Sequence, residues 1–124
     1  MGELSAIAAG GALGSVMRFW MSGGIYTLLG RNFPYGTLSV NLLGSFFIGI
    51  AFIFLTERLS LGSEMRAFIL IGFLGAFTTF STFSLETLLL LQEGLLLRAA
   101  LNMVLSVTLC LFATWAGIML ARSI

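Results

Sequence analysis

The sequence predicts an all-α membrane protein built from four transmembrane helices. Hydrophobic residues make up 59% of the 124 residues and charged residues only 9%, whereas soluble domains carry about 25% charged residues. Four long apolar segments follow one another, and each is close to the roughly 20 residues that a helix needs to cross the hydrocarbon core. Because little polar surface is left to face water, the lipid bilayer is the expected environment.

The four predicted helices cover residues 4–29, 36–56, 66–92 and 99–122. Arg18 is the only charge within the first, and the third continues past Glu86 to about Gln92. Gly94 lies just beyond, as is typical of a helix stop. The connections are short, and the first contains Pro34, the only proline. The whole chain is therefore expected to form one transmembrane domain.

The composition excludes several classes of catalytic and binding site. His, Asp and Lys are absent, which removes a Ser-His-Asp triad, a lysine Schiff base and a P-loop lysine. Cys110 is the only cysteine, so neither an intrachain disulfide nor a thiolate zinc site can form. The net charge is +1 and no basic run indicates a nucleic-acid partner. We therefore expect neither an enzyme nor a nucleic-acid-binding protein.

The arginines in the loops indicate no clear orientation in the membrane. With four spans both termini lie on one side, and that side holds Arg58, Arg66 and Arg122. The other side holds Arg31 and Arg98. Cytoplasmic loops normally carry the excess of arginine, and this excess is almost nil. Either the chain inserts both ways up and pairs with an inverted copy, or a feature other than charge sets one orientation.

Small residues in the first two helices favour close helix contacts. Gly10 and Gly14 have the GxxxG spacing, and Gly44 and Gly49 lie in the second helix. Packing within one subunit explains any one such pair as well as packing between subunits does. Because four helices can hardly surround a pathway by themselves, the glycines together favour a tightly packed oligomer.

Two polar residues stand out in the first two helices. Arg18 lies midway along the first, where an arginine costs about 2.5–3.5 kcal/mol on insertion scales. It either offers a fixed positive charge to an anion, reaches the interface, or pairs with Glu86. Asn41 shares one helix face with Thr37 and Ser45. Its amide either donates hydrogen bonds to an anion or joins two helices.

The stretch GAFTTFSTFS, residues 75–84, concentrates hydroxyls and phenyl rings in the third helix. Three faces carry polar or aromatic residues at helical spacing: Phe80 and Phe83, then Ser81 and Ser84, then Thr79, Thr82 and Glu86. Rings spaced in this way are usually packing. However, ring edges are weakly positive and hydroxyls donate hydrogen bonds, which suits the conduction of a small anion. An ionised Glu86 would oppose an anion, so its carboxyl must share a proton or a hydrogen bond, or face elsewhere.

Thr78 and Thr79 follow Gly75 as two consecutive β-branched residues. The helix could loosen there and free backbone carbonyls, although a continuous helix is equally compatible with the sequence. Broken backbone at membrane depth is tolerated only where it is buried in protein or lines a cavity.

Four segments resemble the Fluc family of microbial fluoride channels, also called CrcB: GGALGSVMR, PYGTLSVNLLGS, GFLGAFTTFSTFSLE and LLQEG. They occur in order over nearly the whole chain. The resemblance implies a fluoride-selective channel that exports fluoride passively from the cytoplasm across the bacterial inner membrane. It also implies an antiparallel, dual-topology homodimer with two pores at its interface and with the third helix broken near its middle.

The resemblance further implies roles for individual residues. Ring edges of Phe80 and Phe83 would meet fluoride, Asn41 would hydrogen-bond it near the vestibule, and Arg18 would be the vestibule arginine. The other polar pore residues would be Thr37, Ser81, Thr82, Ser84, Glu86, Ser106 and Thr114. Cys110 falls between the last two, where a serine is expected, and a thiol is the weaker donor.

A structural Na⁺ at the centre of the dimer is also implied by the resemblance. The backbone carbonyls of Gly75 and Thr78 from both subunits would hold it, and carbonyl oxygen suits a hard cation. No organic cofactor is expected.

Two other functions compete with a fluoride channel as interpretations of this sequence. A small multidrug-resistance-type proton-coupled transporter also has four spans, but that class needs a carboxylate embedded in its first helix. This chain has Arg18 there, and Glu3 lies at the extreme terminus. A structural subunit without transport would explain the glycines but not the polar stripe of the third helix.

Overall fold

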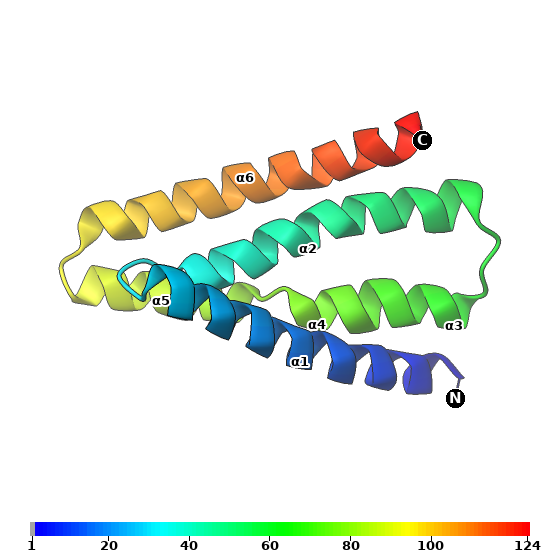
Figure 1. Ribbon diagram of the computed structural model, residues 1–124, viewed down its shortest axis with the longest axis horizontal. Helices are drawn as coiled ribbons and strands as arrows, with labels where there is room; N and C mark the ends of the chain where they lie inside the picture. Colours follow the sequence, from blue (N-terminus) through cyan, green and yellow to red (C-terminus); the bar gives the residue numbers. More distant parts are fainter. Residues whose placement is uncertain (1) are drawn as a thin grey trace.

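The computed structural model describes residues 2–124, and every element in it is helical. Within these residues four helical spans are long and apolar enough to cross a membrane: Gly2–Leu29, Tyr35–Arg58, Ser63–Gln92 and Leu96–Ser123. The spans lie side by side in an elongated bundle, with both termini at the same end (Figure 1). The predicted all-helical fold with four transmembrane spans is confirmed.

A tight connection joins α1 (Gly2–Leu29) to α2 (Tyr35–Ile53). Gly30 has a φ of 85°, the left-handed conformation that ends many helices and favours glycine. Pro34 then precedes α2, where its missing N–H leaves no hydrogen bond unmade, and its carbonyl accepts from the N–H of Leu38 at 3.1 Å.

Two segments of the spans are π-helical rather than α-helical. The second span ends with η1 (Phe54–Arg58), and the third begins with α3 (Ser63–Arg66) and η2 (Ala67–Leu74). Because a π-helix bonds residue i to i+5, its side chains point in directions that an α-helical wheel does not predict. The approach to the GAFTTFSTFS stretch therefore departs from simple helical spacing.

The helical ladder of the third span is interrupted between α4 (Gly75–Phe77) and α5 (Phe80–Gln92). Thr78 and Thr79 have extended backbones, with φ and ψ of −92° and 160°, and of −152° and 122°. Figure 1 shows this connection as a non-helical link between α4 and α5. Backbone groups near the link consequently need other partners.

The end of α5 is a glycine-based stop. Gly94 has a φ of 79°, the N–H of Leu95 donates to the carbonyl of Leu90 at 2.9 Å, and the N–H of Gly94 donates to that of Leu91 at 3.1 Å. This is the Schellman arrangement. The last helix, α6 (Leu96–Ser123), starts directly afterwards.

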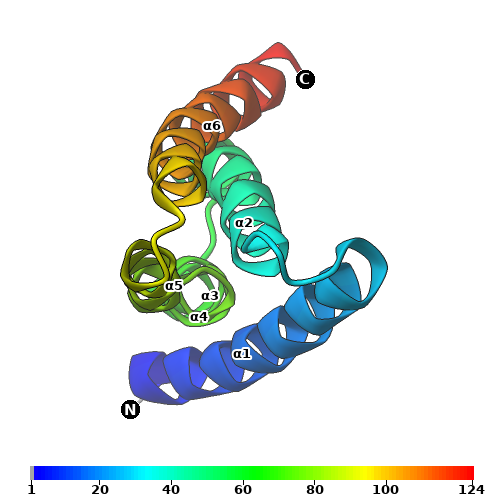
Figure 2. The same cartoon turned by 90° about the vertical axis from the view of Figure 1, so that its left-hand side faces the viewer.

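The helices pack in two close pairs, α2 with α6 and α1 with η2. Figure 2 shows α6 beside α2, with α1 on the other side of the bundle. A Cβ at Gly10 or Gly14 would collide with backbone oxygens of η2, and one at Gly49 or Gly117 would collide with the facing helix of the α2–α6 pair. These glycines therefore serve contacts within one chain, and they give no support to an oligomer.

Candidate functional site

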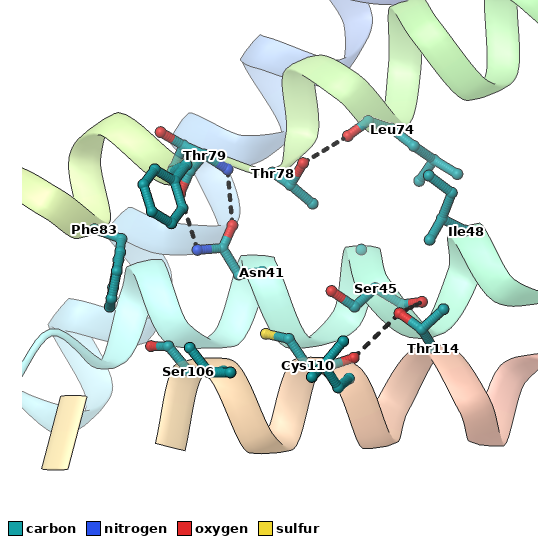
Figure 3. Close-up of a pocket in the computed structure, with 14 residues that line it drawn as sticks. Asn41, Ser45, Ile48, Leu74, Thr78, Thr79, Phe83, Ser106, Cys110 and Thr114 are labelled. Atoms are coloured by element: carbon teal, nitrogen blue, oxygen red, sulfur yellow. Dashed lines mark hydrogen bonds between the residues drawn. The ribbon is translucent and has the colours of Figure 1, made fainter. Parts of the chain in front are cut away.

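Asn41 holds the interrupted backbone of the third span from α2. Its Oδ1 accepts from the N–H of Thr79 at 2.7 Å, and its Nδ2 donates to the Thr79 carbonyl at 2.9 Å. Both bonds are visible in Figure 3. The amide therefore joins two helices, as one of the two sequence interpretations expected. The second N–H of Nδ2 has no partner among residues 2–124.

Thr79 also starts α5. Its side-chain oxygen accepts from the N–H of Thr82 at 3.2 Å, which is the standard N-cap contact. The Thr79 hydroxyl donates to that of Thr82 at 3.1 Å, and the Ser81 hydroxyl lies 3.5 Å away. Thr82, predicted as a pore residue, is thus part of the cap of α5.

Arg18 reaches the same interrupted segment from α1. Its Nε donates to the carbonyl of Ala76 at 3.0 Å. The alternative in which Arg18 pairs with Glu86 is wrong for this structure, because the only ion pair among residues 2–124 joins Arg122 to Glu57 at 3.1 Å. A positive charge is consequently fixed beside the freed backbone.

The carbonyls of Gly75 and Thr78 are among those left without a partner across the interruption within residues 2–124. The N–H groups that would bond them in a continuous helix are those of Thr79 and Thr82, which bond instead to Asn41 and to the Thr79 side chain. Within residues 2–124, neither the Gly75 nor the Thr78 carbonyl accepts a hydrogen bond that crosses the interruption. Gly75 is exposed, so its backbone lies at the surface of the single chain.

A cavity of about 410 Å³ lies between α2, the interrupted third span and α6. Figure 3 shows Asn41, Thr79 and Phe83 on one side of it, and Ser106, Cys110 and Thr114 on the other. No charged side chain is among its lining residues, which are Asn41, Gly44, Ser45, Ile48, Leu74, Thr78, Thr79, Phe80, Phe83, Ser106, Val107, Cys110, Leu111 and Thr114.

Phe80 and Phe83 both line this cavity. Their ring centroids are 5.3 Å apart and the ring planes are tilted by 50°. The Phe80 side chain is 76% exposed, so it borders the cavity without being covered by its own chain. The two rings therefore form one side of the cavity, while most of Phe80 is left uncovered by its own chain.

The side of the cavity formed by α6 holds the two hydroxyls that the resemblance implied, those of Ser106 and Thr114. Thr114 donates to the carbonyls of Ser45 at 3.0 Å and Cys110 at 3.1 Å, and Ser106 donates to Asn102 Oδ1 at 3.4 Å. Cys110 lies between them and lines the same cavity. Its thiol thus occupies the wall position where the resemblance implied a serine.

A buried polar network continues from Ser106 and was missed by sequence reasoning. Asn102 is only 1% exposed, and its Nδ2 donates to Thr87 Oγ1 at 2.8 Å. Thr87 in turn donates to the Phe83 carbonyl at 2.8 Å. The signal available in the sequence was an asparagine in an otherwise apolar run, which in a membrane needs a partner on another helix.

Glu86 lies in a second polar cluster, on the side of α5 that faces α1. Its Oε2 accepts from the Tyr26 hydroxyl at 2.8 Å, and the Thr37 hydroxyl is 3.4 Å from that of Tyr26. The other oxygen, Oε1, is buried and has no hydrogen-bond partner among the described residues. Sequence reasoning placed Glu86 and Thr37 in the site but missed Tyr26.

The predicted site residues therefore fall into separate groups. Cavity-lining positions are Asn41, Phe80, Phe83, Ser106, Thr114 and Thr78. Thr37 and Glu86 form the cluster with Tyr26, while Arg18 and Gly75 lie at the interruption. Ser81 and Ser84 are exposed, and the Ser84 hydroxyl makes no hydrogen bond within residues 2–124.

Comparison with known proteins places this arrangement in a family. Residues 5–118 match the family described as "CrcB-like protein, Camphor Resistance (CrcB)". A relative from Methylococcus capsulatus is 58% identical over 120 residues, which is 97% of this chain and 53% of the relative. The chain thus spans about half the length of that protein.

Two other relatives match from end to end. One from Magnetococcus marinus is 51% identical over 98% of this chain and 99% of its own length. One from Geobacter sulfurreducens is 50% identical over all of both chains. All three relatives are named "Fluoride-specific ion channel FluC".

The four apolar spans and these bacterial relatives identify a multi-pass protein of the bacterial inner membrane. The family match covers most of the chain and includes at least part of each of the four spans. The chain belongs to the CrcB family.

Proposed function

We propose that this protein is a fluoride-selective ion channel that lets fluoride leave the cytoplasm passively. One observation carries the proposal: Phe80, Phe83 and Asn41 border a single uncharged cavity between three helices, and Asn41 Nδ2 keeps one N–H without a partner among residues 2–124. The names of the full-length relatives support the same ion. Purified protein in liposomes should release fluoride and retain chloride, and release of both or neither would contradict the proposal.

The cavity suits an ion that must enter and leave again. Its lining holds two phenyl rings, whose edges can attract an anion weakly, one side-chain amide and hydroxyls, and no positive side chain that would trap an anion. Ser106 and Thr114 continue the polar lining along α6, although their hydroxyl protons are engaged with Asn102 Oδ1 and with the Ser45 and Cys110 carbonyls. The Thr82 hydroxyl, which accepts from Thr79, lies at the start of α5. Several weak contacts in a row favour passage over tight binding.

The working unit that we propose is an antiparallel homodimer with two pores. Phe80, Ser81, Ser84 and Gly75 are exposed on the single chain. Hydroxyls and a freed carbonyl facing lipid would be costly, so a protein partner is expected to cover them. Reporter fusions at the C-terminus should then show both orientations in the membrane, and a single orientation would refute dual topology.

A structural Na⁺ fits the same surface. The Gly75 and Thr78 carbonyls are freed because Asn41 and Thr79 take the N–H groups that would otherwise bond them. Oxygen ligands of this kind suit a hard cation, and residues 2–124 offer no cluster of His, Cys, Asp or Glu that would hold a metal instead. Two such chains would supply four carbonyls, and the ion would tie them together.

Arg18 has two compatible roles in this proposal. Its Nε secures the Ala76 carbonyl, while its Nη groups have no protein partner among residues 2–124. These remaining N–H donors can face an anion at the entrance, as expected of a vestibule arginine. No structural observation favours a proton-coupled drug transporter, because the charge midway along α1 is this arginine and Glu3 lies in its first turn.

A further inference from the structure

Tyr26 is enclosed by residues from two segments of the chain. A Cβ at Gly36 would collide with the Tyr26 ring, so that glycine allows the ring to lie against the start of α2. On the ring face, the guanidinium carbon of Arg31 lies 4.4 Å from the ring centroid, which is a cation–π contact. The ring position is therefore fixed by packing, and with it the position of the hydroxyl.

The Tyr26 hydroxyl is the only hydrogen-bond partner of the Glu86 carboxyl group within residues 2–124. It donates to Glu86 Oε2 at 2.8 Å, while the buried Oε1 has none. The Thr37 hydroxyl lies 3.4 Å from the Tyr26 oxygen, where it can donate to it and leave the tyrosine proton for Glu86. The side chain of Glu86 is long, and one contact holds it toward α1.

The position of the Glu86 carboxyl matters for an anion in the cavity because Phe83, which lines the cavity, lies one helical turn away. Phe83 precedes Glu86 by three residues on α5 and lines the cavity, whereas Glu86 does not. A carboxylate that turned from α1 toward Phe83 would place negative charge next to an uncharged anion pathway. Such a charge would repel an entering anion strongly in a medium of low dielectric constant.

We propose that Tyr26 is a positioning residue. Its hydroxyl holds the Glu86 carboxyl beside the ion pathway and prevents that carboxyl from turning into the pathway. This inference rests on the proposed function, because it assumes that an anion uses the cavity. The tyrosine hydroxyl contacts the carboxyl group of Glu86 directly, and the ring contacts with Gly36 and Arg31 keep the hydroxyl in place.

The test compares Tyr26→Phe with Tyr35→Phe in the full-length protein in liposomes. Each change removes one hydroxyl, and the Tyr35 hydroxyl makes no hydrogen bond within residues 2–124. Tyr26→Phe should lower fluoride release about tenfold, the shift expected when one hydrogen bond to a charged group is lost. Tyr35→Phe should release fluoride like the parent protein, and equal rates for the two variants would overturn the proposal.

A double-variant comparison separates positioning from general damage. If Tyr26 acts through Glu86, adding Tyr26→Phe to Glu86→Gln should change the rate little, since no carboxylate remains to be held. The same fractional loss in both backgrounds would contradict the proposal.

An infrared measurement tests the contact without any ion flux. The carboxyl band of Glu86 is identified as the band that disappears in Glu86→Gln. The frequency of this band should shift in Tyr26→Phe and stay unchanged in Tyr35→Phe. An unshifted band would overturn the proposal even if Glu86→Gln conducts too slowly for comparison. If the parent protein releases no fluoride, the channel function fails, while the band shift still decides whether Tyr26 holds Glu86.

Discussion

The side-chain amide of Asn41 makes a two-point contact with the backbone of Thr79. Oδ1 accepts from its N–H at 2.7 Å and Nδ2 donates to its carbonyl at 2.9 Å. The contact replaces bonds that a continuous helix would make, and it releases the carbonyl of Gly75 for other uses. The interruption of the third span is therefore stabilised by a polar side chain of α2, Asn41.

Replacing Asn41 with alanine should destabilise the protein as well as slow fluoride release. Unpaired buried backbone groups cost about 1–3 kcal/mol each, and the Thr79 groups are part-buried, so thermal unfolding in detergent should begin at a lower temperature. Asn32→Ala is the matched control, because that side chain lies in the loop before α2 and makes no hydrogen bond among residues 2–124. Equal stability of the two variants would argue against the two-point contact.

Phe80→Ile should reduce fluoride release while leaving the assembly intact. The change keeps an apolar side chain but removes the ring edge beside the cavity. Loss of an aromatic contact worth about 0.5–1.5 kcal/mol corresponds to a two- to tenfold fall in rate. Phe52→Ile, at an exposed position of α2 away from the cavity, should conduct like the parent protein. An unchanged rate in Phe80→Ile would remove Phe80 from the pathway.

Much of the fold was predictable because a membrane span needs only length and apolarity. Helical spacing also identified Asn41, Phe80 and Phe83, which do line one cavity. Spacing could not identify the partner of Arg18, since that partner is a backbone carbonyl 58 residues away in the chain. Long-range contacts of this kind leave no local pattern.

The remaining omissions have a similar cause. Tyr26 looks like an ordinary interfacial aromatic residue until the fold brings Glu86 to its hydroxyl. Asn102 and Thr87 meet across the α5–α6 turn, which depends on the stop at Gly94. The π-helical course of η2 further changes which side chains face each other, and an α-helical wheel does not contain that information.

Arg18→Met should weaken the interrupted segment. Methionine keeps much of the length but donates no hydrogen bond, so the carbonyl of Ala76 loses its partner. We expect a loss of about 1–3 kcal/mol in the free energy of unfolding and slower fluoride release, because the positive charge near the entrance is lost too. Arg66→Met, at an exposed residue of α3, should leave both quantities near the parent values. Matching effects of the two changes would contradict a specific role for Arg18.

Removal of Na⁺ should weaken the proposed dimer. Exchange of Na⁺ for a large organic cation leaves the carbonyls of Gly75 and Thr78 without the hard cation that they suit. The measurements are fluoride release and the fraction of dimer in detergent, each followed as Na⁺ is returned. Recovery with Na⁺ but not with the organic cation supports the site. If neither fluoride release nor the fraction of dimer changes with Na⁺, no such ion is needed.

The central claim is selective passage of fluoride, and release of anions from liposomes tests it most directly. Liposomes holding purified protein and loaded with potassium fluoride or potassium chloride would receive a potassium ionophore to balance charge. Ion-selective electrodes then follow each anion outside. Fluoride should appear rapidly and chloride should stay at the level of protein-free liposomes. Chloride release at the fluoride rate, or fluoride release no faster than without protein, would contradict the account.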